Sequence, residues 1–227
     1  MGALFNMGRQ IVRSISRVND WPWGYVIYRT VYTPESYRIW DSALEKIDTL
    51  IYQETEDERR EHVRRDCPDS ELPDGRPNQY LREGYEKVVM DDKALYENAS
   101  LDQIRDYFRS WAGDNKAETR YDICLVIDGE SLDSIMPHPV PRLSWQDPCG
   151  FVLAVDRKFT PGGYDNEYYE GWMRVEIDVL FRLYGTLVGG GVEMNNVCPF
   201  PGRAGPIPIY DGASGSFVEG EKRWVFM

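Results

Sequence analysis

Residues 24 to 51 constrain the fold more than any other stretch, because they encode a strand, a turn and a helix in direct succession. Gly24 to Tyr32 is rich in the β-branched and aromatic residues that favour strands. Thr33 and Pro34 follow, and proline is favoured at the first helical position, where its missing N–H would have had no partner. Apolar residues then recur three and four positions apart, at Tyr37, Trp40, Leu44, Ile47 and Ile51. We expect this helix to pack its apolar face on the sheet.

A second helix is predicted from residue 101 to about residue 112. Ser100 and Gln103 have the spacing of a capping box, and Gly113 stands where a helix of this length would end. Further strands are predicted at residues 85–90, 121–128, 151–156 and 172–177, a last helix at 179–184, and a hairpin at 217–226. The runs 121–128 and 151–156 are almost continuously apolar, which favours central strands covered on both faces.

This order of elements predicts an α+β fold. We expect a twisted, mostly antiparallel sheet of four to six strands, with two long helices on one face, in an arrangement that resembles a ferredoxin-like fold. A parallel, doubly wound sheet is the alternative, because periodicity does not give strand direction. We expect an N-terminal amphipathic arm (1–20), a single α+β domain (21–188) and a Gly/Pro-rich C-terminal extension (189–227). The two ends are expected to pack on the domain or to reach a second copy in a homodimer.

Short blocks of the sequence resemble a family of uncharacterised fungal intracellular proteins. The blocks are Trp-Gly-Tyr-Val-Ile-Tyr-Arg at residues 23–29, Phe-Arg-Ser-Trp at 108–111, Val-Ile-Asp at 126–128 and Gly-Trp-Met-Arg-Val at 171–175. The resemblance covers about residues 21 to 188. It implies a fungal origin and no defined activity.

Charge and hydropathy exclude several classes of protein. The net charge is −12, from 38 acidic and 26 basic residues, so the chain as a whole repels nucleic acid and anionic membranes. We therefore expect no nucleic-acid partner. No apolar run approaches the roughly 18 residues of a transmembrane helix, and the N-terminus lacks a continuous signal-peptide core. These features predict a cytoplasmic protein.

The sequence contains no recognisable cofactor or metal motif. Its four cysteines do not form a Cys-x-x-Cys pair, and no Walker or dinucleotide-binding glycine pattern occurs. Asp91 and Asp92 resemble the start of an aspartate-rich magnesium motif, but we interpret them as a loop before the second helix, since a hard cation needs several oxygen ligands. We expect neither a cofactor nor a metal.

Charged residues inside the predicted strands are the candidates for a site. Arg29 lies in the middle of the first strand and Asp128 ends a central one. A charge that faces a core must be paired or must line a cavity. An Arg29–Asp128 salt bridge is one interpretation. The other is a pocket with Arg29, Tyr28 and Asp128 as catalytic residues and with four substrate-binding residues, Tyr32, Trp111, Cys124 and Trp172.

Seven Trp and fifteen Tyr are compatible with an aromatic core or with an aromatic-lined pocket. We interpret the chain as a cofactor-independent enzyme, a cyclase, isomerase or pericyclic catalyst that acts on a small apolar metabolite of fungal secondary metabolism. Arg29, Tyr28 and Tyr32 would donate hydrogen bonds, Asp128 would orient them, and Trp111 and Trp172 would form walls. The alternative is a non-enzymatic, intracellular protein-interaction module.

Overall fold

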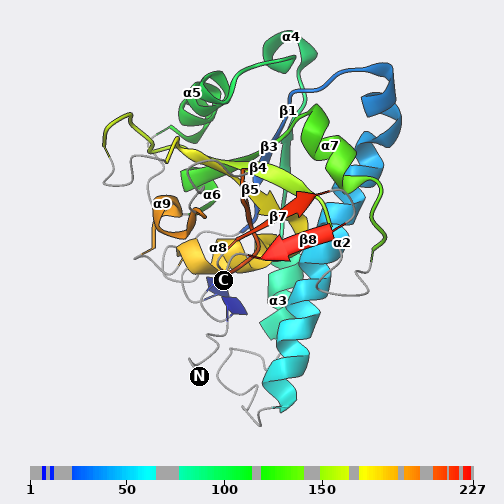
Figure 1. Ribbon diagram of the computed structural model, residues 1–227. Helices are drawn as coiled ribbons and strands as arrows, with labels where there is room; N and C mark the ends of the chain where they lie inside the picture. The colour runs from blue at the N-terminus through cyan, green and yellow to red at the C-terminus, as the bar shows by residue number, and fades with distance from the viewer. Residues whose placement is uncertain are drawn as a thin grey trace.

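Helices and one mixed β-sheet form the structure, a computed structural model of the chain (Figure 1). It describes residues 7–8, 11–12, 22–64, 77–113, 119–140, 149–163, 169–188, 192–199, 207–213, 215–219 and 222–225. The combination of helices with a sheet of both parallel and antiparallel pairs confirms the α+β class predicted from the sequence. No helix within these ranges has the length and apolar character needed to cross a membrane.

The sheet has eight strands in the described residues, in the order β2-β1-β3-β4-β5-β6-β7-β8. The strands are β1 (Val26–Arg29), β2 (Val88–Met90), β3 (Ile123–Ile127), β4 (Phe151–Asp156), β5 (Trp172–Glu176), β6 (Ile209–Tyr210), β7 (Ser216–Glu219) and β8 (Lys222–Val225). Four of the seven pairings are antiparallel, and the β2-β1, β1-β3 and β5-β6 pairs are parallel. The expected four to six strands were too few, because the C-terminal hairpin extends the same sheet. A ferredoxin-like arrangement is not confirmed.

The helices lie on both faces of the sheet. They are α2 (Pro34–Arg64), α3 (Pro77–Gly84), α4 (Lys93–Tyr96), α5 (Leu101–Ala112), α6 (Thr119–Asp122), α7 (Gly129–Ile135), α8 (Leu180–Val188) and α9 (Met194–Val197), with a 3₁₀ turn η2 at Ile177–Val179. α2, α7 and α8 cover one face, and α5 covers the other. The expectation of two long helices on one face was therefore wrong.

Strand order explains this correction. β2 and β3 flank β1 on opposite sides, and both are parallel to it. Crossovers between parallel strands are almost always right-handed. The β1-to-β2 connection and the β2-to-β3 connection run in opposite directions along the sheet, so their helices lie on opposite faces. This part of the sheet follows the doubly wound alternative, whereas the β3-β4 and β4-β5 pairs are antiparallel.

Local sequence explains where α2 and α5 begin and which faces they bury. Thr33 Oγ1 accepts a hydrogen bond from the Ser36 N–H at the start of α2, and Trp40, Ile47 and their neighbours on the stripe are buried. Tyr37, predicted on the same stripe, is 54% exposed. α5 has the complete predicted capping box, with reciprocal hydrogen bonds between Ser100 and Gln103.

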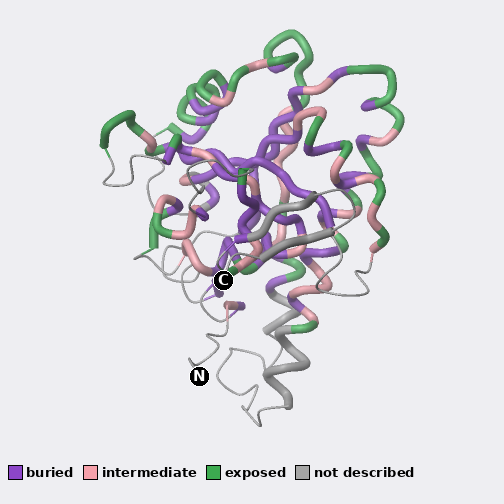
Figure 2. Tube along the Cα trace, in the orientation of Figure 1, coloured by how far each residue is buried: buried purple, intermediate pink, exposed green. Residues whose placement is uncertain are grey.

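Strand alternation divides the core into two layers, one on each side of the sheet. Tyr25, directly before β1, and Ile27 in β1 face α2 and α8, while Val26 and Tyr28 face α5. β3 and β4 are buried along their whole length, as their continuous apolar runs predict. Figure 2 shows this buried sheet at the centre, with exposed residues on the outer helices.

The two ends of the chain contribute to this body. β6, β7 and β8 come from the segment 189–227, expected to be an extension, and β6 pairs with β5. Of the predicted N-terminal arm, only residues 7–8 and 11–12 lie among the described residues. Ile11 and Val12 are buried in the α2–α8 layer, and a Cβ on Gly185 would lie 2.8 Å from the Met7 Cβ, so α8 packs closely on this segment.

Candidate functional site

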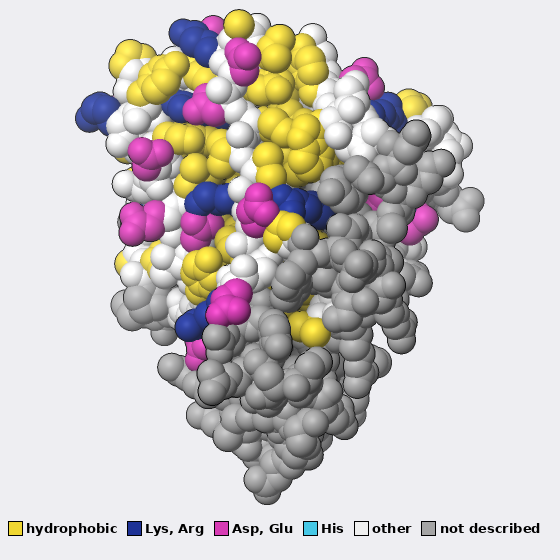
Figure 3. Space-filling model, turned by 180° about the vertical axis from the view of Figure 1, so that it is seen from behind, with side chains coloured by type: hydrophobic (Ala, Val, Ile, Leu, Met, Phe, Trp, Pro, Cys, Tyr) yellow, Lys and Arg dark blue, Asp and Glu magenta, His cyan; other side chains and the backbone are white. Residues whose placement is uncertain are grey.

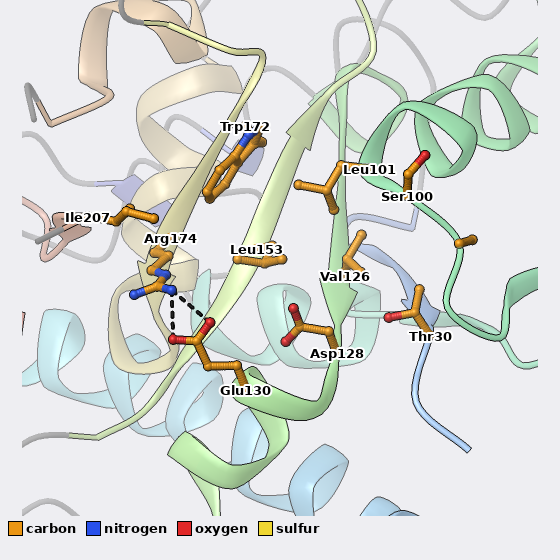
Figure 4. Close-up of a pocket in the computed structure, with 11 residues that line it drawn as sticks. Thr30, Ser100, Leu101, Val126, Asp128, Glu130, Leu153, Trp172, Arg174 and Ile207 are labelled. Carbon is orange, nitrogen blue, oxygen red and sulfur yellow. Dashed lines mark hydrogen bonds and ion pairs between the residues drawn. The ribbon is translucent and has the colours of Figure 1, made fainter. Parts of the chain in front are cut away.

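A pocket of about 330 Å³ opens on the α5 side of the sheet, at the carboxyl ends of β1 and β3 (Figure 4). The chain leaves β1 for α2 on one face, and it reaches β3 after α5 on the other. At their carboxyl ends β1 and β3 continue into α2 and α7, which both cover the opposite face, so the pocket lies on the side that these two connections do not cover. Residues 99–101, at the start of α5, form one wall of the pocket.

The floor of the pocket is a row of side chains from neighbouring strands. Val126 of β3 is opposite Leu153 of β4, which is opposite Arg174 of β5. Val126 and Leu153 are buried, and Trp172 lies two residues before Arg174 on the same face of β5. Ile207, 47% exposed, lies at the far edge. The centre of the floor, at Val126 and Leu153, is thus apolar, and polar side chains share the rest of the lining.

Asp128 and Thr30 place polar groups at the strand ends. The Asp128 carboxylate is half-buried, and its Oδ1 accepts a hydrogen bond from the Ser131 N–H at 2.8 Å, which caps α7. Asp128 makes no ion pair with any residue in the ranges that the structure covers. Thr30 is 6% exposed, and its side chain makes no hydrogen bond within the same ranges. In Figure 4 its hydroxyl is directed toward Asp128.

Arg174 and Glu130 form an ion pair at the rim. Arg174 Nη2 donates to both carboxylate oxygens of Glu130, at 2.7 and 2.8 Å. The guanidinium also lies over the Phe151 ring, 4.6 Å from its centroid. Glu130 is 62% exposed, so this pair is partly solvated, whereas Arg174 is only 18% exposed. Its Nε–H is buried and has no hydrogen-bond acceptor among the described residues.

Arg29 does not line this pocket. Its Nη1 pairs with Asp91 Oδ2 at 3.1 Å, and its Nε donates to the Val31 carbonyl. Rings of Tyr32, Tyr37 and Trp40 enclose the guanidinium at 4.8, 4.4 and 4.6 Å. The partner predicted for Arg29, Asp128, instead caps α7, so the predicted Arg29–Asp128 salt bridge does not form, and the Arg29 guanidinium is enclosed by aromatic rings. This cage also explains the exposure of Tyr37, whose ring covers a cation.

The other predicted site residues are divided between the pocket and the core. Trp172 lines the pocket together with Asp128. Tyr28 and Cys124 are buried in the α5 layer, and burial raises the pKa of both the Tyr28 phenol and the Cys124 thiol above their ordinary values. Trp111 is 38% exposed and stacks on Phe108.

Tyr32 packs against Arg29. The pKa of the Tyr32 phenol is raised, mainly by burial and to a smaller extent by Asp91. Of the seven predicted residues, the structure thus brings Asp128 and Trp172 together at the pocket.

Sequence reasoning missed Thr30, Glu130 and Arg174. A signal for Arg174 was available, since it is a charged residue at an alternating position inside a strand, as Arg29 is. Thr30 and Glu130 carried no such signal, because polar residues at the ends of strands are common in loops.

One group of described side chains has a spacing suited to a metal ion. Donor atoms of Cys149, Glu176 and Asp178 lie within 4.8 Å of one another. Thiolates favour soft metals and carboxylates favour hard ones, so this donor set does not select a particular ion. Each of the three residues also interacts with other groups in the protein. The cluster therefore adds no defined chemistry to the pocket.

Comparison of the chain with known proteins found no matching family model, no matching curated protein and no matching solved structure. The resemblance to fungal intracellular proteins therefore stays a prediction, and function must be argued from the pocket.

Proposed function

We propose that the protein is a cofactor-independent enzyme, an isomerase or cyclase, that acts on a small and largely apolar molecule in the pocket beside β1 and β3. The resemblance to fungal proteins extends this proposal to a metabolite of secondary metabolism, converted in the cytoplasm. The pocket volume of about 330 Å³ lies at the lower end of the range of small-molecule sites.

The observation that carries the proposal is the half-buried Asp128 carboxylate, which has no cationic partner among the described residues and lies beside the apolar floor of the pocket. A carboxylate taken out of water loses solvation that a neighbouring cation would normally replace. Its Oδ1 stabilises the start of α7 as a cap, and its Oδ2 is left for a bound molecule that presents a proton or a hydrogen-bond donor.

The chemistry available here is proton transfer with positioning. Asp128 Oδ2 accepts a proton from the bound molecule and returns it at another atom of the same molecule, which isomerises or cyclises it without loss or gain of atoms. The Thr30 hydroxyl holds the polar group beside Asp128, and the walls around Leu153 and Trp172 hold the apolar body. This assignment replaces Arg29 and Tyr28 as the acting groups, since both are enclosed by other side chains.

Asp128→Asn tests this proposal, because asparagine caps a helix as well as aspartate does but cannot accept the proton. We expect conversion of a fungal metabolite extract, followed by mass spectrometry, to fall by at least about 100-fold. Asp133→Asn, at an exposed position of α7, is the matched control and should leave conversion unchanged. Equal conversion by the wild type and Asp128→Asn would remove Asp128 from the mechanism.

A second candidate function, a protein-interaction module, is favoured by exposed apolar side chains. Large hydrophobic residues at least 36% exposed are Tyr37, Leu95, Tyr107, Trp111, Val192 and Ile207. Figure 3 shows hydrophobic side chains gathered on the upper half of one face. Such surfaces commonly bind proteins, here a second copy in the proposed homodimer. Light scattering on the wild type and on Leu95→Ser/Trp111→Ser would show a dimer that the substitutions dissociate; a monomer in both cases would contradict it.

A further inference from the structure

The charges at the pocket do not balance. Arg174 is the cation that lines it, and its guanidinium is engaged by both oxygens of Glu130. Asp128 is the second carboxylate, and it has no such partner among the described residues. Two carboxylates and one guanidinium leave the pocket with one net negative charge. The surrounding protein, with a net charge of −12, reinforces attraction for a cation.

Unused hydrogen-bonding groups at the strand ends are mainly acceptors. An ionised carboxylate offers about four lone-pair positions. Asp128 uses one, for the Ser131 N–H. Thr30 is 94% buried as a residue. Its hydroxyl is directed toward Asp128 and makes no hydrogen bond within the described ranges, so it offers two further acceptor positions. A ligand group with several N–H donors fits this pair better than a group with one.

An anionic ligand fits the same space poorly. It would lie against Asp128 and Glu130, and like charges in a partly dry pocket repel strongly. The first turn of α5 beside the pocket does not offset this, because its capping box already uses the Ser100 hydroxyl and the Gln103 N–H, and Asp102 adds another negative charge.

We propose that the pocket selects an apolar primary amine, whose ammonium group binds between the Asp128 carboxylate and the Thr30 hydroxyl while its hydrocarbon body lies against Leu153 and Trp172. This inference rests on the proposed function, because it names the substrate class of the same site. The ammonium group then supplies the positive charge and the N–H donors that the Asp128 carboxylate lacks among the described residues. The Glu130–Arg174 pair closes the rim and stays intact on binding.

Three probes of similar size test the charge preference: 2-phenylethylamine, 2-phenylethanol and phenylacetate. Binding to the full chain is followed by NMR, from changes in the indole N–H resonances of the seven tryptophans. The Trp172 resonance is the one that disappears in the Trp172→Phe variant. We expect the amine to bind about tenfold more tightly than the alcohol, since hydrogen bonds to a charged group are roughly twice as strong, and phenylacetate not to shift Trp172.

Two substitutions locate the effect. Asp128→Asn should remove the preference for the amine and leave binding of the alcohol within about twofold, because the cap of α7 is kept. Thr30→Val, which removes only the hydroxyl, should weaken the amine about three- to tenfold. Glu130→Gln is the control for a charge at the rim and should change amine affinity by less than about threefold.

The outcomes distinguish a failure of the amine inference from a failure of the proposed enzymatic function. If the amine and the alcohol shift Trp172 with equal affinity, or if Asp128→Asn keeps the preference, the amine inference is overturned and an apolar small-molecule site remains. If no probe shifts Trp172 at millimolar concentration, this pocket is not a small-molecule site, and the proposed function is overturned as well.

Discussion

Glu54 on α2 provides a quantitative test of how burial controls stability. Its Oε1 accepts a hydrogen bond from Arg182 Nη2 at 3.0 Å, and its Oε2 is buried with no hydrogen-bond partner among the described residues. Burial raises the pKa of Glu54 from 4.5 to about 7; the Arg182 charge opposes this rise, and the Asp178 charge adds to it. The carboxyl group is therefore held more favourably in its protonated form than in its ionised form.

The sign follows from the raised pKa in the folded state. Stabilisation by the protonated carboxyl is complete below pH 4.5 and is lost as the pH rises through about 7. At about 1.4 kcal/mol per pH unit, the difference between the two pKa values corresponds to about 3 kcal/mol lost by pH 8.5. Glu54→Gln resembles the protonated form at every pH and retains an oxygen for Arg182, so it avoids this loss.

The measurement is urea unfolding of the wild type and Glu54→Gln at pH 5 and at pH 8.5. We expect similar free energies of unfolding at pH 5 and a variant more stable by about 2–3 kcal/mol at pH 8.5. Glu45→Gln, at an exposed position of the same helix, should show no such pH-dependent gain. A constant difference between Glu54→Gln and the wild type at both pH values would refute the reasoning, because it would show that ionisation of Glu54 costs nothing.

Three further substitutions test the packing by chemical denaturation. Lys46→Met should lower the free energy of unfolding by about 2 kcal/mol, because Lys46 Nζ donates to the carbonyls of Ile135, Met136 and His138 at the end of α7; an unchanged stability would mean that water replaces the ammonium fully. Gly150→Ala should cost more than about 2 kcal/mol, because φ is +86° there and a Cβ would lie 2.6 Å from the Ile135 Cα; a loss below 1 kcal/mol would show that α7 moves away easily. Arg29→Met should cost about 2–3 kcal/mol, since it leaves Asp91 without its cation and opens the aromatic cage; if Asp91→Asn costs as much, the ion pair rather than the cage dominates.

Elements set by neighbouring residues were predictable from the sequence. The capping box of α5 links residues three positions apart, and the apolar stripe of α2 repeats every three to four positions. The hairpin of β7 and β8 also joins adjacent segments, and the buried strands β3 and β4 appear as continuous apolar runs. Each of these patterns reports one local conformation, so a single sequence is enough to recognise it.

Strand order, helix side and side-chain partners were decided only by the tertiary structure. Periodicity shows that a strand has two faces but does not show which neighbour it takes, so the placement of β2 and β3 on opposite sides of β1 was not predictable. Arg29 was recognised as a buried charge, yet its partner Asp91 lies 62 residues away and Asp128 was the wrong choice.

The pocket has the same origin, because its floor aligns three strands and its polar groups come from distant positions in the chain, at Thr30, Asp128 and Arg174. Sequence alone therefore determined most of the residues that are buried in helices and strands, although Tyr37 and Trp111 are exposed. The meeting of Thr30, Asp128 and Trp172 at one site arises from long-range strand pairing, which no local pattern encodes.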